Sequence, residues 1–323
     1  MGAARLQGAA PETPAVRDDA IEVQELRKRY GDFVAVDGVS FAVRRGEAFG
    51  ILGPNGAGKT TTLEMIEGLR RPDGGRVAVL GRPVWPDPQS VQALIGVQLQ
   101  STALFDRLTA RELLMLFAEF YSRRDARERS DAVLAMVGLE EKAGAYANQL
   151  SGGQQQRLAI ALALVHDPAI VFLDEPTTGL DPQARRNLWD VIRDVNGAGK
   201  TVVLTTHYLE EAEELCERVA IMDGGQVIAL DTPAALVASL QSDARLAFSA
   251  SDLGGIDLSA LPAVHTATEV EGSHVLYTSD APATVYALLE AARSRGLALA
   301  DLSVRGPSLE DVFLHLTGRE FRE

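Results

Sequence analysis

The sequence predicts an α/β protein with a mixed central sheet, an antiparallel β subdomain, a helical insertion and a small α+β domain at the carboxyl end. Short apolar runs, each followed by a loop and a helical pattern, indicate buried parallel strands joined by helices. A stretch with amphipathic helical periodicity lies between two of these predicted strands and indicates a helical insertion. The chain has 323 residues, 46% of them apolar, which is enough to bury the core of one large domain and a small one.

Residues 1–20 are rich in Ala, Gly, Pro and charged side chains without periodicity, so we expect a disordered tail there. From Ile21 to Val43, alternating segments separated by turn residues indicate antiparallel strands. The runs A-F-G-I-L, A-I-V-F-L and T-V-V-L-T-T then predict buried parallel strands. Between the first two runs, helical periodicity predicts an inserted helical subdomain over about residues 101–164.

A helix is expected after Thr232-Pro233 and ends near Leu240, where Gln241-Ser242-Asp243 breaks the pattern. We therefore expect a main domain over residues 21–240 and an accessory domain over residues 241–323. Strand-like and helical segments alternate in the accessory domain, which is typical of small α+β units such as the ferredoxin-like fold.

The composition disfavours nucleic acid as a partner and indicates no membrane-spanning segment. The chain carries 31 Lys+Arg against 45 Asp+Glu, a net charge of -14, which is the wrong sign for neutralising many phosphates. No stretch approaches the roughly 18 consecutive apolar residues of a spanning helix, and no signal peptide or myristoylation pattern is present. The single cysteine, Cys216, cannot form an internal disulfide and is expected in the core of a protein from a reducing compartment.

The first motif with specific chemistry is G-P-N-G-A-G-K-T-T, which lies between the strand A-F-G-I-L and a helical pattern. This is the phosphate-binding loop G-x-x-x-x-G-K-[ST] in its strand, loop and helix setting. Its glycines let backbone N–H groups face the phosphates, Lys59 reaches the β- and γ-phosphates, and Thr60 can ligate Mg²⁺. The residues expected to bind the nucleotide are Gly53, Pro54, Asn55, Gly56, Ala57, Gly58, Lys59, Thr60 and Thr61.

Such a loop requires an acidic site at the end of another buried strand. Asp174 and Glu175 follow the run A-I-V-F-L directly. Asp174 can hold Mg²⁺, directly or through water, and Glu175 can act on the attacking water. Two acidic residues after a strand would by themselves indicate a solvated loop, but together with the phosphate-binding loop they predict an ATPase or GTPase.

The segment L-S-G-G-Q-Q-Q-R, residues 150–157, predicts a second phosphate-facing surface. Ser151 would cap the helix that follows, while Gly152 and Gly153 leave backbone N–H groups bare. One active site has no need of two such surfaces from distant segments. The segment resembles the signature motif of ABC ATPases, in which two nucleotide domains pack head to tail and each signature loop, here Ser151 to Gln154, closes on the ATP of the other domain.

This resemblance covers about residues 21–240 and implies roles for further residues. Tyr30 matches the aromatic that stacks on adenine, with a core aromatic as the alternative. Gln100 matches the glutamine that senses the metal and the γ-phosphate, with Gln98 as the alternative. Asp181 ends a segment that resembles the loop linking the two sites of the dimer, and His207 matches the switch histidine.

The resemblance implies catalytic roles for Lys59, Gln100, Glu175 and His207 and a metal site formed by Thr60, Gln100 and Asp174. It also implies ATP and Mg²⁺ as cofactors. A second nucleotide-binding subunit and an integral membrane permease on a separate chain are the implied partners. The implied location is peripheral, at the cytoplasmic face of the cell membrane. Four other histidines match no motif and are expected to be structural: His166, His265, His274 and His315.

The ending P-S-L-E-D-V-F-L-H-L-T-G-R is similar to the tail of ATPases of the daunorubicin-resistance type, which serve exporters of drugs, lipids or polysaccharides. It favours export. One alternative is a soluble ABC ATPase without a transport role, which the acidic charge and the single nucleotide domain disfavour. The other is an importer ATPase with a regulatory carboxyl-terminal domain.

Overall fold

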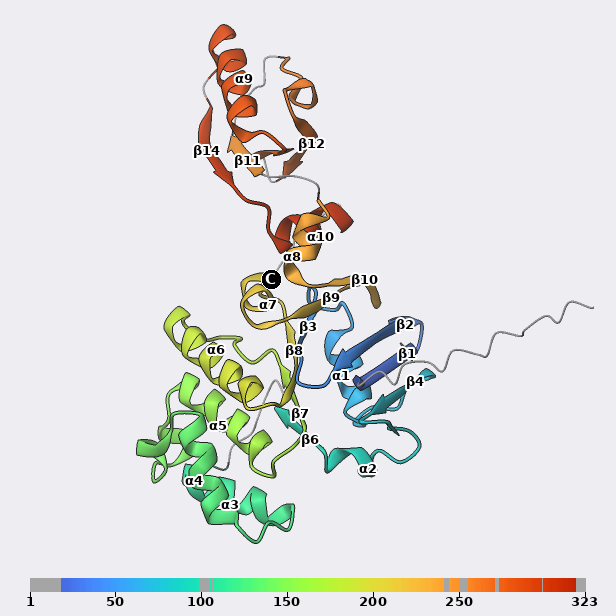
Figure 1. Cartoon of the computed structure of the whole chain (residues 1–323), viewed down its shortest axis with the longest axis vertical. Coiled ribbons are helices and arrows are strands. Elements are labelled where there is room, and N and C mark those ends of the chain that lie inside the picture. The colour runs from blue at the N-terminus through green and yellow to red at the C-terminus, as the bar shows by residue number, and fades with distance from the viewer. Residues whose placement is uncertain are drawn as a thin grey trace, which may run out of the picture.

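The computed structural model describes residues 19–98, 105, 107–240, 244–249, 255–270, 273–297 and 299–317. These residues form three sheets, with the strand orders β2-β1-β4-β5, β10-β9-β3-β8-β7-β6 and β12-β13-β11-β14. The third sheet lies apart from the other two, at one end of the molecule (Figure 1). The predicted α/β class with a mixed sheet is confirmed.

The first sheet is antiparallel, and β1 and β2 form a hairpin in which Val23 pairs with Phe41. Both side chains are buried, whereas their neighbours in the two strands, Glu22 and Ser40, are exposed. The alternation over residues 21–43 thus reflects a sheet with one buried face. The strands are β1 (Asp19–Tyr30), β2 (Phe33–Arg44), β4 (Gly74–Val79) and β5 (Arg82–Pro83).

The second sheet is mixed, because β10 runs antiparallel to β9 while all other neighbours are parallel. Every residue of β3, β7 and β8 is buried. Phe172 points into the core shared with the antiparallel sheet and Val171 into the core shared with the helices. The strands are β3 (Ala48–Leu52), β6 (Ile95–Gln98), β7 (Ile170–Asp174), β8 (Thr201–Thr206), β9 (Arg218–Asp223) and β10 (Gln226–Asp231).

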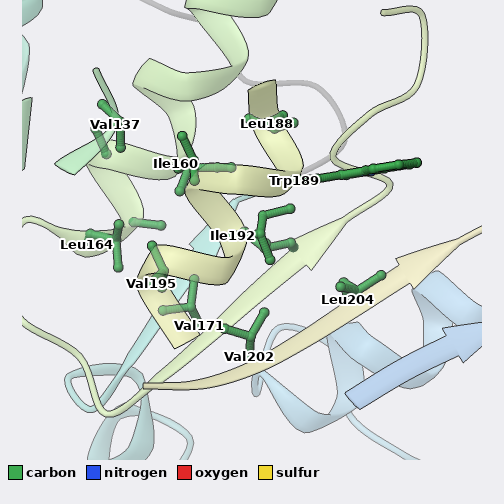
Figure 2. Close-up of a cluster of buried hydrophobic side chains, with 14 of the residues drawn as sticks. Val137, Ile160, Leu164, Val171, Leu188, Trp189, Ile192, Val195, Val202 and Leu204 are labelled. Carbon is green, nitrogen blue, oxygen red and sulfur yellow. The ribbon is translucent and has the colours of Figure 1, made fainter. Parts of the chain in front are cut away.

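Helices α3, α4 and α5 lie between β6 and β7, where the helical insertion is predicted. Figure 2 shows Ile160 of α5 and Ile192 of α6 in one apolar cluster with Val171 and Val202 of the sheet. No helix in the described part of the chain has the length and apolar character needed to span a membrane. The helices are α1 (Lys59–Ile66), α2 (Gln89–Gln92), α3 (Ala110–Phe120), α4 (Ala126–Met136), α5 (Gly152–Leu164), α6 (Pro182–Gly197) and α7 (Leu209–Leu215), with 3-10 turns at Glu140–Lys142 and Ala147–Gln149.

The third sheet has its own small core, in which Leu246, Phe248 and Leu276 pack against Leu288 of α9. The elements of this part are β11 (Ala244–Ser249), β12 (Val264–Val270), β13 (Ser273–Thr278), α9 (Ala281–Ser294) and β14 (Ala300–Arg305), with a 3-10 turn at Leu258–Ala260.

Helix α10 (Leu309–Thr317) returns from the third sheet to the main body, where it packs on α7 and α8 (Pro233–Ala238) (Figure 1). Its apolar residues Leu309, Val312 and Phe313 belong to the core that covers the mixed sheet. The boundary after residue 240 stays a prediction, but the last helix of the accessory domain contributes to the core of the main one.

Replacing Phe313 with Ala should lower the free energy of unfolding by about 3–5 kcal/mol, because a fully buried ring leaves a cavity. The affinity for ATP should change little, since α10 lies outside the predicted nucleotide motifs. Denaturant unfolding and titration with a fluorescent ATP analogue would measure the two quantities. Leu316→Ala on the same helix, at a side chain that is half exposed, is the control. Equal stability of the two variants would contradict the packing of α10.

Candidate active site

The phosphate-binding loop joins β3 to α1, and two of its glycines have no room for a side chain. A Cβ at Gly53 would lie 2.4 Å from the carbonyl oxygen of Met222, and one at Gly58 would lie 2.4 Å from that of Ala35. Gly58 has a φ of 96° and forms the N-cap of α1, a conformation that favours glycine. The loop is therefore held against β2 and β9 at the positive end of α1, where anions bind readily.

Lys59, the first residue of α1, is buried beneath this loop. Its Nζ donates to the carbonyl oxygens of Gly53 (2.8 Å) and Pro54 (3.2 Å) and lies 3.4 Å from Oε1 of Glu175. Burial lowers the pKa of Lys59, and the Glu175 carboxylate opposes that effect. The structure thus brings the predicted lysine and glutamate into contact from segments far apart in the sequence.

Asp174, the last residue of β7, faces α1. Its Oδ1 accepts a hydrogen bond from the Thr60 hydroxyl over 3.3 Å and another from the Thr205 hydroxyl of β8. Burial, the largest effect, raises the pKa of Asp174, and the hydrogen bond from Thr205 opposes it. A hydroxyl and a carboxylate side by side are hard oxygen donors, so Thr60 and Asp174 fit a magnesium ion.

Glu175 lies in the loop after β7 with a φ of 48°, which is uncommon for a residue other than glycine and is often found at functional sites. Its backbone N–H donates to Oγ1 of Thr205 over 3.0 Å. Its Oε2 accepts a hydrogen bond from the Thr178 hydroxyl over 3.3 Å and lies 3.2 Å from Nδ1 of His207. The carboxylate is therefore held between Lys59 and His207, at the carboxyl ends of β7 and β8.

A pocket opens between the phosphate-binding loop and the β1–β2 turn. Tyr30 and Phe33 flank this turn, line the pocket and are 42% and 61% exposed, so their rings can stack on a flat heterocycle. No motif pointed to Phe33, and its only signal in the sequence is its place across the turn from Tyr30. The lining residues are Tyr30, Phe33, Ala35, Asn55, Gly56, Ala57, Gly58, Lys59, Thr60, Thr61 and Glu175.

The signature segment begins α5 as predicted. The Ser151 side chain accepts a hydrogen bond from the N–H of Gln154 over 3.4 Å, and the Gln154 side chain accepts one from the N–H of Ser151 over 2.9 Å. This capping box leaves the exposed Gly152 open on the surface and brings Gly153 against Ala184 of α6. Among the described residues that line the pocket, none comes from residues 151–154.

Asp181 is the exposed N-cap of α6, and its carboxylate accepts hydrogen bonds from the N–H groups of Gln183 and Ala184. It also does not line the pocket described above. Gln100 lies outside the described residues. The alternative, Gln98, is the buried last residue of β6, which pairs with β7 next to the site.

The remaining histidines and the cysteine lie away from this pocket. The Nε2 atom of His166 is 2.9 Å from the carbonyl oxygen of Ile95, and burial lowers the pKa of this histidine. His274 packs against Phe248 in the small core. Cys216 is buried in the core that covers the mixed sheet, where burial raises its pKa.

Comparisons with known proteins agree with this geometry. The family model described as ABC transporter matches residues 36–178. The chain is 41% identical over 306 residues to the Nod factor export ATP-binding protein I of Burkholderia pseudomallei (strain 1710b), covering 93% of this chain and 97% of that protein. It is 41% identical over 312 residues to the protein of the same name from Paraburkholderia xenovorans (strain LB400), covering 94% and 99%.

Two of the similar solved structures are dimeric cassettes. One is described as the dimeric structure of a bacterial ABC transporter cassette; it is 33% identical with a TM-score of 0.60 and covers 66% of this chain and 98% of that chain. The other, in a post-hydrolysis state with ADP and phosphate, is 32% identical with a TM-score of 0.60 and the same coverage. The relatives span nearly the whole chain. The phosphate-binding loop, Asp174-Glu175 and His207 meet at one edge of the mixed sheet. The chain therefore belongs to the ATP-binding subunits of ABC transporters, and it is an ATPase.

Proposed function

We propose that this chain binds ATP with Mg²⁺, hydrolyses it between two copies of itself, and drives export through a separate membrane-spanning subunit. The observation that carries the proposal is the meeting of Lys59, Asp174, Glu175 and His207 at one edge of the mixed sheet, beside a pocket with exposed aromatic rings. The carboxyl ends of strands in open α/β sheets are where ligands bind.

In this proposal adenine stacks on Tyr30 and Phe33, and the triphosphate follows the N–H groups of the phosphate-binding loop. Lys59 offsets the charge on the β- and γ-phosphates. Thr60 and Asp174, together with Gln100, would hold Mg²⁺, which supplies charge neutralisation at the phosphate oxygens when it is bound.

Glu175 accepts a hydrogen bond from the attacking water and so orients it towards the γ-phosphate. Nδ1 of His207 lies 3.2 Å from this carboxylate, and in this proposal His207 contacts the same phosphate. Both side chains are buried, so their electrostatic effect on the reacting groups is less screened than it would be in water.

The two surfaces that do not line the pocket, Ser151 to Gln154 and Asp181, complete the site from a second copy of the chain. Bare N–H groups at the start of α5 are suited to phosphate, and they have no phosphate to contact within their own chain. The similar cassettes described as dimers support this arrangement.

Export is supported by relatives named as Nod factor export ATP-binding proteins and by the ending of the chain. We infer that the chain works at the cytoplasmic face of a membrane, bound to a separate subunit that forms the path for the cargo. The cargo itself is recognised by that subunit in this proposal. This pairing can be tested by reconstituting the protein with a membrane-spanning chain encoded next to it and measuring ATP turnover. Stimulated turnover would support the pairing with that subunit, and unchanged turnover would contradict it.

The metal site can be tested with Asp174→Asn. The purified protein should hydrolyse ATP with Mg²⁺ and not with EDTA, and the variant should lose roughly 100-fold in turnover, because a neutral amide holds the ion poorly. A phosphate-release assay measures both quantities. Asp167→Asn, which removes a carboxylate paired with Lys200 outside the pocket, is the control. Turnover that persists in EDTA would rule out the proposed metal.

A further inference from the structure

Glu211 of α7 is a fully buried carboxylic acid with no role in the site described above. It follows His207 by one helical turn and points away from solvent towards α6. Its Oε1 accepts a hydrogen bond from Nε1 of Trp189 over 3.0 Å, and Trp189 is itself buried. Figure 2 shows the Trp189 side chain extending from α6, in the apolar cluster that also contains Leu188 and Ile192. This bond therefore joins the helix that begins at Asp181 to the helix that follows His207.

Two buried hydroxyls, those of Thr206 and Thr177, lie close to the same carboxyl. Thr206 precedes His207, and Thr177 lies two residues after Glu175. Burial raises the pKa of Glu211, and the hydroxyls of Thr206 and Thr177 and the indole of Trp189 oppose it. One side chain thus contacts the segments that carry both the catalytic glutamate and the switch histidine.

Thr177 is close enough to Glu211 to oppose the pKa rise that burial causes at its carboxyl, but the contact is not a well-formed hydrogen bond. Oε2 of Glu211 and Oγ1 of Thr177 are buried, and neither forms a hydrogen bond within the described part of the chain.

A second contact also connects α6 with the segment that contains His207. The guanidinium of Arg185 on α6 lies 4.1 Å from the ring centre of Tyr208, whose ring lies 4.2 Å from that of His207. The positive charge of Arg185 also favours the ionised form of Glu211. Two independent contacts therefore connect α6 to the His207 segment.

A buried carboxylate is a costly way to hold two helices together, because an apolar side chain of similar size would avoid the desolvation penalty. We propose that Glu211 is a positioning residue for ATP hydrolysis: it joins Trp189 of α6 to the His207 and Glu175 segments and sets their geometry. This rests on the proposed function of His207 and Asp181. Movement of α6, which begins at the surface assigned to the second copy, reaches the reacting groups through this carboxyl.

The test compares Glu211→Gln, which replaces the carboxyl group with an amide of the same shape, with Trp189→Phe, which removes the donor, in the full-length protein. Glu210→Gln on the exposed side of α7 is the matched control. We expect kcat to fall at least about 10-fold in the first two variants while KM for ATP stays within about twofold, because the nucleotide-binding residues are untouched. The control should behave as the parent does.

Trp189 also supplies a spectroscopic check, since the chain has only 2 tryptophans. In a Trp85→Phe background, Glu211→Gln should shift the emission of Trp189, because a neutral amide replaces the acid at its N–H. No shift would overturn the contact.

Folded variants with the parental kcat would overturn the positioning role. Equal losses in kcat and in ATP affinity, together with a lower melting temperature, would also overturn it, because they would indicate a general loss of structure. If Glu211→Gln does not fold, kcat and KM of Trp189→Phe decide the question. A parent protein without ATP turnover would instead overturn the proposed function, so the two failures can be told apart.

Discussion

Replacing Lys59 with Ala should lower ATP turnover by roughly 100-fold or more. Its ammonium group is fixed under the phosphate-binding loop by two carbonyl oxygens and lies beside Glu175. In the proposed mechanism it both binds the phosphates and offsets the charge that develops on them, so affinity and kcat should fall together. A phosphate-release assay and titration with a fluorescent ATP analogue would measure the two effects.

Lys59→Arg tests whether a positive charge is enough for turnover or whether the compact shape of the lysine ammonium group is also required. Arginine keeps the charge, but its planar group does not match a space shaped for a compact ammonium. It should therefore remain far below the parent. Lys200→Ala is the control, because that lysine pairs with Asp167 and lies outside the pocket. Near-normal turnover in Lys59→Ala would remove the phosphate-binding loop from the mechanism.

In Glu175→Gln, ATP should bind without being turned over and should hold two copies of the chain together. The amide keeps the shape of the side chain but loses the charge that orients the attacking water. Each nucleotide would contact the phosphate-binding loop of one copy and Ser151 to Gly153 of the other. A ligand that binds the dimer better than the monomer shifts the equilibrium towards the dimer. Size-exclusion chromatography with light scattering, with and without ATP, would show the change in mass.

Adding Ser151→Arg to this variant should abolish the ATP-dependent dimer, because the longer side chain obstructs the exposed start of α5. Arg124→Ala, on an exposed part of the helical insertion, should leave it intact. A Glu175→Gln protein that binds ATP yet stays monomeric at high concentration would show that the isolated subunit does not form the sandwich. A dimer that survives Ser151→Arg would contradict the assignment of the signature segment.

Much of the site could be predicted from short stretches of sequence. The phosphate-binding loop requires glycines at fixed spacing before a lysine, and the packing of Gly53 and Gly58 against backbone oxygens gives the physical reason. Ser151 could be predicted as a cap because its hydrogen bond is made within the same turn. Patterns of this kind concern neighbours in the chain, so the residues alone specify them.

The contacts between distant segments could not be predicted in the same way. Phe33 belongs to no motif, and its part in the pocket depends on where the β1–β2 turn lies relative to the phosphate-binding loop. Helix α10 follows the accessory sheet in the chain but completes the core of the main domain. The periodicity of α10 predicts an apolar stripe on the helix but does not predict which surface of the protein that stripe covers. Any apolar surface of suitable width would be compatible with the same pattern.

By itself, the amino-acid sequence determined the α/β class and the order of the strands and helices that it predicts, and it predicted the chemical groups of the candidate site. Only the tertiary structure decided which groups meet: Lys59 with Glu175, Glu175 with His207, and Trp189 with the acid at Glu211. Local hydrogen bonding and the period of the apolar residues act over one or two turns and can be followed along the chain. The meeting of distant side chains depends on how the sheets and helices pack against one another, and that packing is a property of the folded chain as a whole.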